Sequence, residues 1–147
     1  MPDKIRTSCL ECGATNNFPM ASAGKTVVCG KCKSPLAVPG QVLEPAAWRV
    51  ANLIEKASLS LLIDFYSTTC APCHMMRPIV EGVAKRRAGD VMVIKVNVEL
   101  PENRELAAAF KVQAVPTFVI IKKGYETARS TGAMPETDFS LWVASQA

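Results

Sequence analysis

The sequence predicts an α/β domain with a mixed central sheet flanked by helices, preceded by a small N-terminal four-cysteine metal-binding module. Three observations support this fold class. The almost continuous apolar run 59–66 is typical of a buried strand, and it ends at a CxxC motif where a helix is expected to begin. Strand and helix patterns then alternate to the end of the chain. The first 40 residues instead contain two further CxxC pairs and few large apolar side chains.

Residues 1–40 are expected to form a zinc-ribbon or zinc-knuckle module. Two CxxC pairs separated by 16 residues match the four-cysteine zinc pattern, and the expected ligands are Cys9, Cys12, Cys29 and Cys32. Tetrahedral thiolate sites suit Zn²⁺, so one structural zinc ion is the expected cofactor. Iron in a rubredoxin-like site is the alternative. Local disulfides or free thiols would leave the spacing unexplained.

Residues 41–147 are expected to form the second domain, which begins with a short strand or linker over 40–44. Pro45 suits the first turn of a helix over about 46–57, whose apolar face is expected to include Trp48 and Leu53. The buried strand 59–66 follows. A polar break then leads into the helix that begins at the cysteine pair.

The second half of this domain contains three more predicted strands and two more helices. A buried strand over 91–98 precedes a short helix over 102–110. Strand 117–122, the turn Lys123-Gly124 and a return strand through Thr131 predict an antiparallel hairpin. Gly132 ends the hairpin, and the closing helix 135–146 is expected to turn Phe139 and Val143 inward.

The motif Cys70-Ala71-Pro72-Cys73 lies where a predicted strand gives way to a helix. Unpaired backbone N–H groups and the positive end of the helix dipole both stabilise a thiolate there. Since thiolates attack disulfides, the position predicts redox chemistry. With His74 the motif also matches haem attachment, which would require an oxidising compartment. We expect His74 instead to be an exposed neighbour that lowers the Cys70 pKa when protonated.

Composition and charge restrict the location and partners. A net charge of +4 gives no electrostatic case for nucleic acid, and no apolar run approaches a membrane span. No secretory signal is visible at the N-terminus, and six cysteines in such a chain favour metal and catalytic roles over structural disulfides. We therefore expect a cytoplasmic protein with neither nucleic-acid nor membrane partners. We also expect a monomer.

From about residue 42 onward the sequence resembles the thioredoxin family. Asp64, six residues before Cys70, resembles the buried aspartate of that family, and the CxPC motif resembles its active site. Lys95 falls where the family has the lysine partner of the aspartate, and Val115-Pro116 resembles its cis-proline loop. Gly132 matches the substrate-groove glycine. The preceding cysteine module resembles that of the thioredoxin 2 type.

The resemblance implies a protein-disulfide reductase that takes electrons from a thioredoxin reductase. Cys70 is expected to attack a substrate disulfide, and Cys73 is expected to resolve the mixed disulfide. Asp64 is expected to act as the base for Cys73 through a water molecule; the alternative is a structural acid paired with Lys95. An ordinary turn proline is the alternative interpretation of Pro116. The expected substrate-binding residues are Thr69, Ala71, Pro72, Val115, Pro116 and Gly132.

Two departures from the family pattern affect its substrate surface. Thr69 stands where the family usually has tryptophan, and Ala71 where it has glycine, so the partner range and reduction potential are expected to differ. A different class of function is a zinc-dependent, redox-sensing holdase or assembly factor whose CxxC motif acts as a sensor. In a third hypothesis, the zinc thiolates themselves are oxidised and release the metal.

Overall fold

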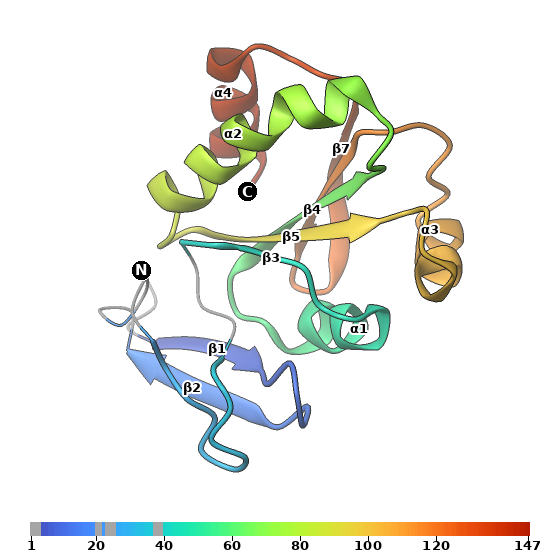
Figure 1. Ribbon diagram of the computed structural model, residues 1–147. Helices are drawn as coiled ribbons and strands as arrows, with labels where there is room; N and C mark the ends of the chain where they lie inside the picture. The colour runs from blue at the N-terminus through green and yellow to red at the C-terminus, as the bar shows by residue number, and fades with distance from the viewer. Residues whose placement is uncertain (1–3, 20–21, 23–25, 37–39) are drawn as a thin grey trace.

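The computed structural model describes residues 4–19, 22, 26–36 and 40–147, and these residues form two separate β-sheets (Figure 1). The first is a two-stranded antiparallel hairpin of β1 (Lys4–Ser8) and β2 (Thr15–Pro19). The second is a five-stranded sheet with the order β3-β5-β4-β6-β7. The hairpin lies at one side of the larger sheet, below α1 in Figure 1.

The five-stranded sheet is mixed, as the sequence predicts. Its strands are β3 (Val42–Leu43), β4 (Ser60–Tyr66), β5 (Val91–Asn97), β6 (Thr117–Lys122) and β7 (Tyr125–Thr131). Strands β3, β5 and β4 are parallel, whereas β6 pairs antiparallel with both β4 and β7. The predicted hairpin is therefore confirmed, and the segment predicted as a strand or linker contributes the short edge strand β3.

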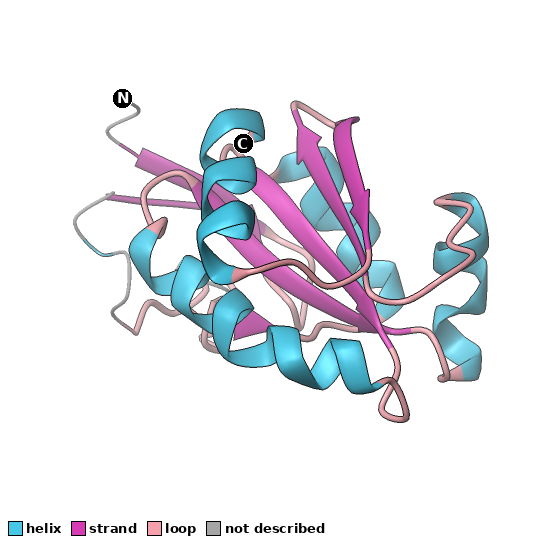
Figure 2. Ribbon diagram, turned by 90° about the horizontal axis from the view of Figure 1, so that it is seen from above, coloured by secondary structure: helices cyan, strands magenta, loops and turns pink. Residues whose placement is uncertain are grey.

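Helices cover both faces of this sheet (Figures 1 and 2). One face carries α2 (Ala71–Arg86) and α4 (Glu136–Gln146), and the other carries α1 (Ala47–Lys56) and α3 (Arg104–Ala109), which follows the 3₁₀ turn η2 (Pro101–Asn103). None of the described helices has both the length and the apolar character needed to cross a lipid bilayer.

Alternation along β4 divides the apolar residues between two cores. Leu61, Ile63 and Phe65 pack with residues of α1 and α3, whereas Leu62 packs with residues of α2 and α4. Because successive side chains of a strand point to opposite faces, Asp64 shares the face of Leu62 and lies on the side covered by α2. The alternation of side chains along β4 therefore places Asp64 on the same side of the sheet as the helix that carries the cysteine pair.

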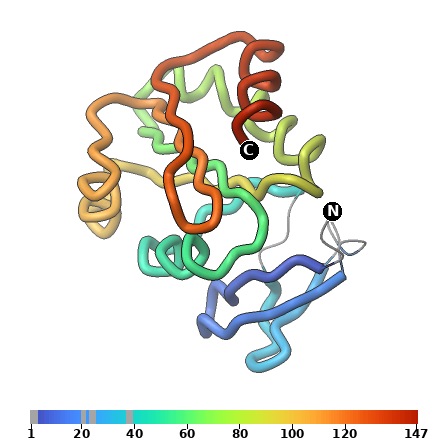
Figure 3. The backbone as a smooth tube through the Cα atoms, turned by 180° about the vertical axis from the view of Figure 1, so that it is seen from behind, coloured from blue at the N-terminus to red at the C-terminus, as the bar shows by residue number. Residues whose placement is uncertain are grey.

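The N-terminal hairpin contributes to a third, smaller core. Ile5, Phe18 and Leu36 pack there with Leu59, which directly precedes β4, and with the side chains of Cys9 and Cys29. Figure 3 shows from behind that the hairpin lies next to α1. With so few apolar side chains, this region requires additional stabilisation from a metal or from its neighbours.

The prediction that Trp48 belongs to the apolar face of α1 is wrong. Trp48 is 59% exposed, while its neighbour Arg49 is 3% exposed. The guanidinium Nε of Arg49 donates to the Leu10 carbonyl at 2.6 Å, and Nη2 donates to the Glu11 carbonyl. Burial of the charged residue is possible because the N-terminal module supplies these acceptors.

Candidate active site and metal centre

Cys70 and Cys73 lie at the start of α2 and form a disulfide. Cys70 is the N-cap residue of the helix, and its Sγ accepts a hydrogen bond from the Cys73 backbone N–H at 3.1 Å. Cys70 is half-buried and Cys73 is 8% exposed. The first sulfur is therefore the more accessible of the two and lies at the helix terminus, where a negative charge is stabilised.

The loop before β6 faces this disulfide. The Val115–Pro116 peptide bond is cis, and the Val115 carbonyl oxygen lies 3.6 Å from Cys70 Sγ. Gly132 N–H donates to the Pro116 carbonyl at 2.8 Å, and Gly132 has a φ of 95°, a conformation that favours glycine. The structure thus places Val115 beside Cys70 and Gly132 against Pro116. Thr69, Ala71 and Pro72 are exposed next to it.

Asp64 is 4% exposed, and burial raises the pKa of its carboxyl to about 7. The positive charge of Lys95 opposes this increase, while the negative charge of Glu44 adds to it. Asp64 and Lys95 are register partners on β4 and β5, but no ion pair within 4.0 Å joins them among the described residues. Asp64 Oδ1 also makes no hydrogen bond within the described part of the chain.

A polar pocket of about 250 Å³ borders the inner cysteine, and its lining residues include Glu44, Tyr66, Cys73, His74 and Lys95. The Tyr66 hydroxyl donates to Glu44 Oε2 at 2.6 Å, and Lys95 Nζ lies 4.1 Å from the centre of the Tyr66 ring. Burial and the Glu44 carboxylate raise the pKa of Tyr66, so its hydroxyl remains a donor. Lys95 lines this pocket and also a small cavity beside Asp64.

His74 is exposed, as predicted, and lies against the segment before Cys70. Its Nε2 is 2.7 Å from the Thr68 carbonyl oxygen. Since a carbonyl oxygen only accepts, this ring nitrogen must carry the proton. Sequence reasoning missed Glu44, because a polar residue beside a short edge strand gives no pattern that links it to Tyr66.

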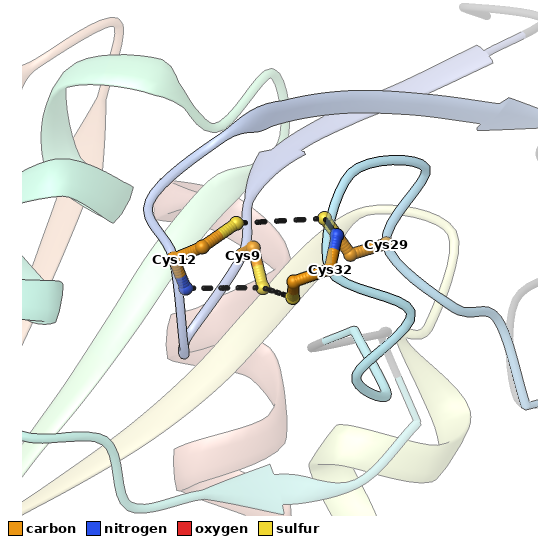
Figure 4. Close-up of side chains that lie close together, drawn as sticks. All are labelled: Cys9, Cys12, Cys29 and Cys32. Atoms are coloured by element: carbon orange, nitrogen blue, oxygen red, sulfur yellow. Dashed lines mark hydrogen bonds between the residues drawn. The ribbon is translucent and has the colours of Figure 1, made fainter.

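The four N-terminal cysteines converge at one point (Figure 4). Their sulfur atoms all lie within 4.8 Å of one another, with 3.5 Å between Cys9 and Cys32 and 3.7 Å between Cys12 and Cys29. These distances exclude disulfides, whose S–S length is about 2.05 Å. Four thiolates at about 2.3 Å from a tetrahedral metal ion would lie about 3.8 Å apart. The four cysteines could therefore hold a metal ion.

The two CxxC turns of this centre have the same hydrogen-bond pattern. Glu11 and Cys12 N–H groups point at Cys9 Sγ at 3.4 and 3.5 Å, and Lys31 and Cys32 N–H groups point at Cys29 Sγ at 3.4 and 3.5 Å. The N–H of Cys32 and the side-chain amide of Asn16 lower the pKa of Cys29 to about 6. Donors aimed at sulfur stabilise the thiolate form that a metal ion binds.

Helix α1 contacts the first of these turns directly. Besides the two hydrogen bonds from Arg49 to the turn's carbonyls, Lys56 Nζ donates to the Gly13 carbonyl at 3.2 Å. Arg6 exchanges hydrogen bonds with Ser58, through the Ser58 N–H at 2.9 Å and the Ser58 hydroxyl at 2.8 Å. Two cations of α1 therefore lie beside a turn that carries two of the four cysteines that could hold a metal ion, an arrangement that sequence patterns did not indicate.

The fold and the cysteine pair define a protein of the thioredoxin fold, in which a dithiol at a helix terminus lies opposite a cis-proline loop. The thioredoxin family model matches residues 41–145 of this chain. The chain therefore belongs to the thioredoxin family.

Individual relatives agree with this assignment. Thioredoxin C-3 of Corynebacterium nephridii is 33% identical over 138 residues, which cover 94% of this chain and 92% of that protein. Thioredoxin of Haemophilus influenzae is 32% identical, over 63% of this chain and 84% of its own length. The structure of a mutant thioredoxin from Halobacterium salinarum has a TM-score of 0.66 and 29% identity, covering 75% of this chain and 94% of that structure. These relatives support thiol–disulfide oxidoreductase activity in general.

Proposed function

We propose that this protein reduces disulfides in protein substrates by dithiol–disulfide exchange through Cys70 and Cys73. The observation that carries the proposal is the position of the pair, with Cys70 accessible at the start of α2 and Cys73 behind it. In the reduced protein, the Cys70 thiolate attacks one sulfur of a substrate disulfide. The substrate S–S bond breaks, its second sulfur leaves as a thiolate, and Cys70 is joined to the substrate.

Cys73 completes the reaction by attacking Cys70 Sγ. The bond between Cys70 and the substrate breaks, the second substrate thiolate leaves, and the two cysteines form the disulfide seen in the structure. The net result transfers two electrons from the protein dithiol to the substrate. Regeneration requires an external dithiol donor, for which we propose a thioredoxin reductase.

Asp64 is the proposed base for Cys73. A thiol has an ordinary pKa of about 8.5, so the attacking form of Cys73 must lose a proton near neutral pH. The carboxyl pKa of about 7 suits this transfer, and β4 directs Asp64 toward the face covered by α2. Lys95 supports the ionised state of Asp64 by its charge. We propose that the proton passes through water in the polar pocket beside Cys73.

We propose that the substrate chain binds in an extended form along the loop before β6. Val115 is half-buried and its carbonyl oxygen lies 3.6 Å from Cys70 Sγ, so a substrate strand bound to Cys70 could pair with the Val115 backbone. Gly132 lies next to Pro116, where the absence of a side chain leaves room for the substrate backbone. Thr69, Ala71 and Pro72 form the opposite side of this proposed groove.

The decisive experiment is reduction of insulin disulfides with dithiothreitol as the electron donor. Wild-type protein should accelerate the reaction, and Cys70→Ser should abolish the acceleration. Cys73→Ser should accumulate a covalent adduct through Cys70, detectable by mass spectrometry, because nothing resolves the mixed disulfide. Normal turnover by Cys73→Ser would contradict the assigned order of attack. Absence of turnover by the wild type would favour a sensor or holdase.

We further propose that residues 1–40 form a structural zinc module, that residues 41–147 form the catalytic domain, and that the protein is of the zinc-containing thioredoxin 2 type. The geometry of the four sulfurs fits Zn²⁺, which would add a fixed tetrahedral cross-link there. The alignment with thioredoxin C-3 leaves only 9 of the 147 residues outside it, so it extends well into the module. Elemental analysis should find one zinc ion per chain; iron would identify a rubredoxin-like site.

The cytoplasmic location and the monomeric state remain predictions. Fractionation of the producing cells would check the first, and light scattering of the purified protein the second.

A further inference from the structure

Glu99 lies beside the segment that precedes Cys70. It follows β5, where its N–H donates to Asn97 Oδ1 at 3.0 Å, and its side chain is exposed. Its carboxylate accepts hydrogen bonds from three consecutive residues of the segment. Thr68 Oγ1 donates to Oε2 at 2.8 Å, Thr69 N–H and Oγ1 donate to Oε1 at 3.3 and 3.2 Å, and Ser67 Oγ also donates to Oε1.

These donors make Glu99 a fixed anion. The hydroxyls of Ser67 and Thr68 lower the pKa of the Glu99 carboxyl to about 2, so it is ionised at neutral pH. Within the described part of the chain, no basic side chain lies within 4.0 Å of it. Since Thr69 directly precedes Cys70, the carboxylate lies within about 10 Å of the Cys70 sulfur, close to the Debye length at physiological ionic strength.

The same contacts determine the chemical character of the surface beside the nucleophile. Thr69 does not present an aromatic ring there; its hydroxyl is turned toward Glu99 and also lies 3.0 Å from Ser67 Oγ. A substrate that reaches Cys70 therefore meets hydroxyls and a negative charge on this side. Apolar side chains would gain little contact area at this point, whereas a cation would gain a Coulomb attraction.

We propose that Glu99 is a specificity-determining residue that favours disulfides flanked by lysine or arginine over disulfides flanked by acidic residues. The inference rests on the proposed reduction of protein disulfides. A unit charge about 10 Å from the carboxylate, at an effective dielectric constant between about 20 and 80, changes the rate roughly twofold to fifteenfold relative to a neutral residue. The comparison of lysine with glutamate includes this factor twice, so the ratio of their rates should be about fourfold or more at low salt. Because the group is exposed, the preference should decrease as ionic strength rises.

The test uses three cyclic disulfide peptides that differ only in the residue next to one cysteine, which is lysine, glutamine or glutamate. The kcat/KM of each is measured with dithiothreitol as donor, at low and at physiological salt. Wild-type protein should reduce the lysine peptide faster than the glutamate peptide. Glu99→Gln should lower this ratio about fourfold or more at low salt, and Glu99→Asp should retain most of it because the charge remains.

Glu102→Gln is the matched control. It removes the same charge three residues further along the chain, from the exposed turn η2, where Glu102 makes no hydrogen bond with the Ser67–Thr69 segment among the described residues. The peptide ratio should stay at the wild-type value in this variant. An equal fall in both variants would mean that net charge alone governs the preference, and would overturn the assignment.

A purely structural role for Glu99 is also distinguishable. In that case Glu99→Gln would slow all three peptides by one factor and leave the lysine-to-glutamate ratio unchanged, which would refute the inference. If Glu99→Gln fails to fold, the inference is tested with Glu99→Asp and with the salt dependence of the wild-type lysine-to-glutamate ratio. A wild-type ratio that does not change with salt would refute the inference. Failure to reduce the glutamine peptide would instead contradict the proposed function.

Discussion

Replacing Asp64 with asparagine should stabilise the protein at alkaline pH. Asp64 is 4% exposed, and its carboxyl has a pKa of about 7 in the folded protein against an ordinary value of 3.8. A higher folded pKa means that the native state binds the proton more tightly than the unfolded chain does. Stability is therefore lost as pH rises from about 4 to about 7, and the full loss persists at higher pH.

The size of this effect follows from the difference between the two pKa values. At 1.36 kcal/mol for each pH unit, the difference between 3.8 and about 7 corresponds to about 4 kcal/mol. Asparagine cannot ionise, so Asp64→Asn should gain roughly this free energy of unfolding at pH 8 and little at pH 4. A gain of this size is a large fraction of the total stability of a small domain.

Urea unfolding of the oxidised protein, followed by circular dichroism at pH 4, 6 and 8, measures the gain. Asp90→Asn is the matched control, because Asp90 is an exposed acid in a surface ion pair with Arg87 at 3.7 Å. It should change stability by no more than about 0.5 kcal/mol at each pH. Equal effects of Asp64→Asn at pH 4 and pH 8, or no gain at pH 8, would show that burial does not raise this pKa.

The same substitution should reduce activity while it increases stability. Without a base at position 64, Cys73 must lose its proton directly to solvent, and resolution of the mixed disulfide should slow about 10²-fold or more near neutral pH. Stopped-flow measurement of substrate release checks this expectation. An unchanged rate would leave Asp64 as a structural acid.

Three further predictions concern the N-terminal module. Arg49→Met should destabilise the protein by about 1–3 kcal/mol in thermal unfolding, because the Leu10 and Glu11 carbonyls lose the charged donors of the buried Arg49 side chain. Arg49→Lys should restore part of this loss. Gly13→Ala should lower the free energy of unfolding by about 1–3 kcal/mol, because Gly13 has a φ of 78° and an added Cβ would lie 2.5 Å from Arg49 Nη1. Gly30→Ala should lower it much less, since the atom nearest to an added Cβ at Gly30 is 3.7 Å away. Metal chelation should expose the amides of residues 4–36 to hydrogen exchange while insulin reduction persists. If insulin reduction is lost together with the protection of these amides, the two parts of the chain do not fold separately.

The contacts between α1 and the first cysteine turn give the module a second source of stability. A zinc tetrathiolate centre at this site would carry a net charge of −2, and Arg49 and Lys56 donate hydrogen bonds to carbonyls of its first cysteine turn. These cations would offset the negative charge of the filled site. Removal of the metal should therefore weaken the attachment of the module to α1.

Local patterns in the sequence were sufficient for most of the fold. The apolar run 59–66 and the run 91–98 became β4 and β5, and the turn Lys123-Gly124 correctly joined β6 to β7. Each of these depends on period and turn chemistry within a few residues of chain. Cysteine spacing likewise predicted which four sulfurs converge, since two CxxC turns can each direct a pair of thiolates to one point.

Predictions that depended on one helix face were less reliable. Trp48 and Arg49 are neighbours on α1, and hydrophobicity alone favours burial of the tryptophan. The structure buries Arg49 because carbonyls of a turn some 39 residues away accept its N–H groups. A pattern within the helix cannot contain that information, because the acceptors belong to another part of the chain.

The sequence by itself determined the order of elements, the cysteine pair at the start of a helix and the four-cysteine module, since all three depend on residues close together in the chain. Only the tertiary structure decided which acidic groups lie near the cysteine pair: Glu44, which accepts a hydrogen bond from Tyr66, and the anionic Glu99, which accepts from Thr69. Burial, the electrostatic potential and hydrogen-bond geometry all depend on segments that the sheet brings together. These three quantities affect the pKa and reactivity of a thiol more strongly than its neighbours in sequence do.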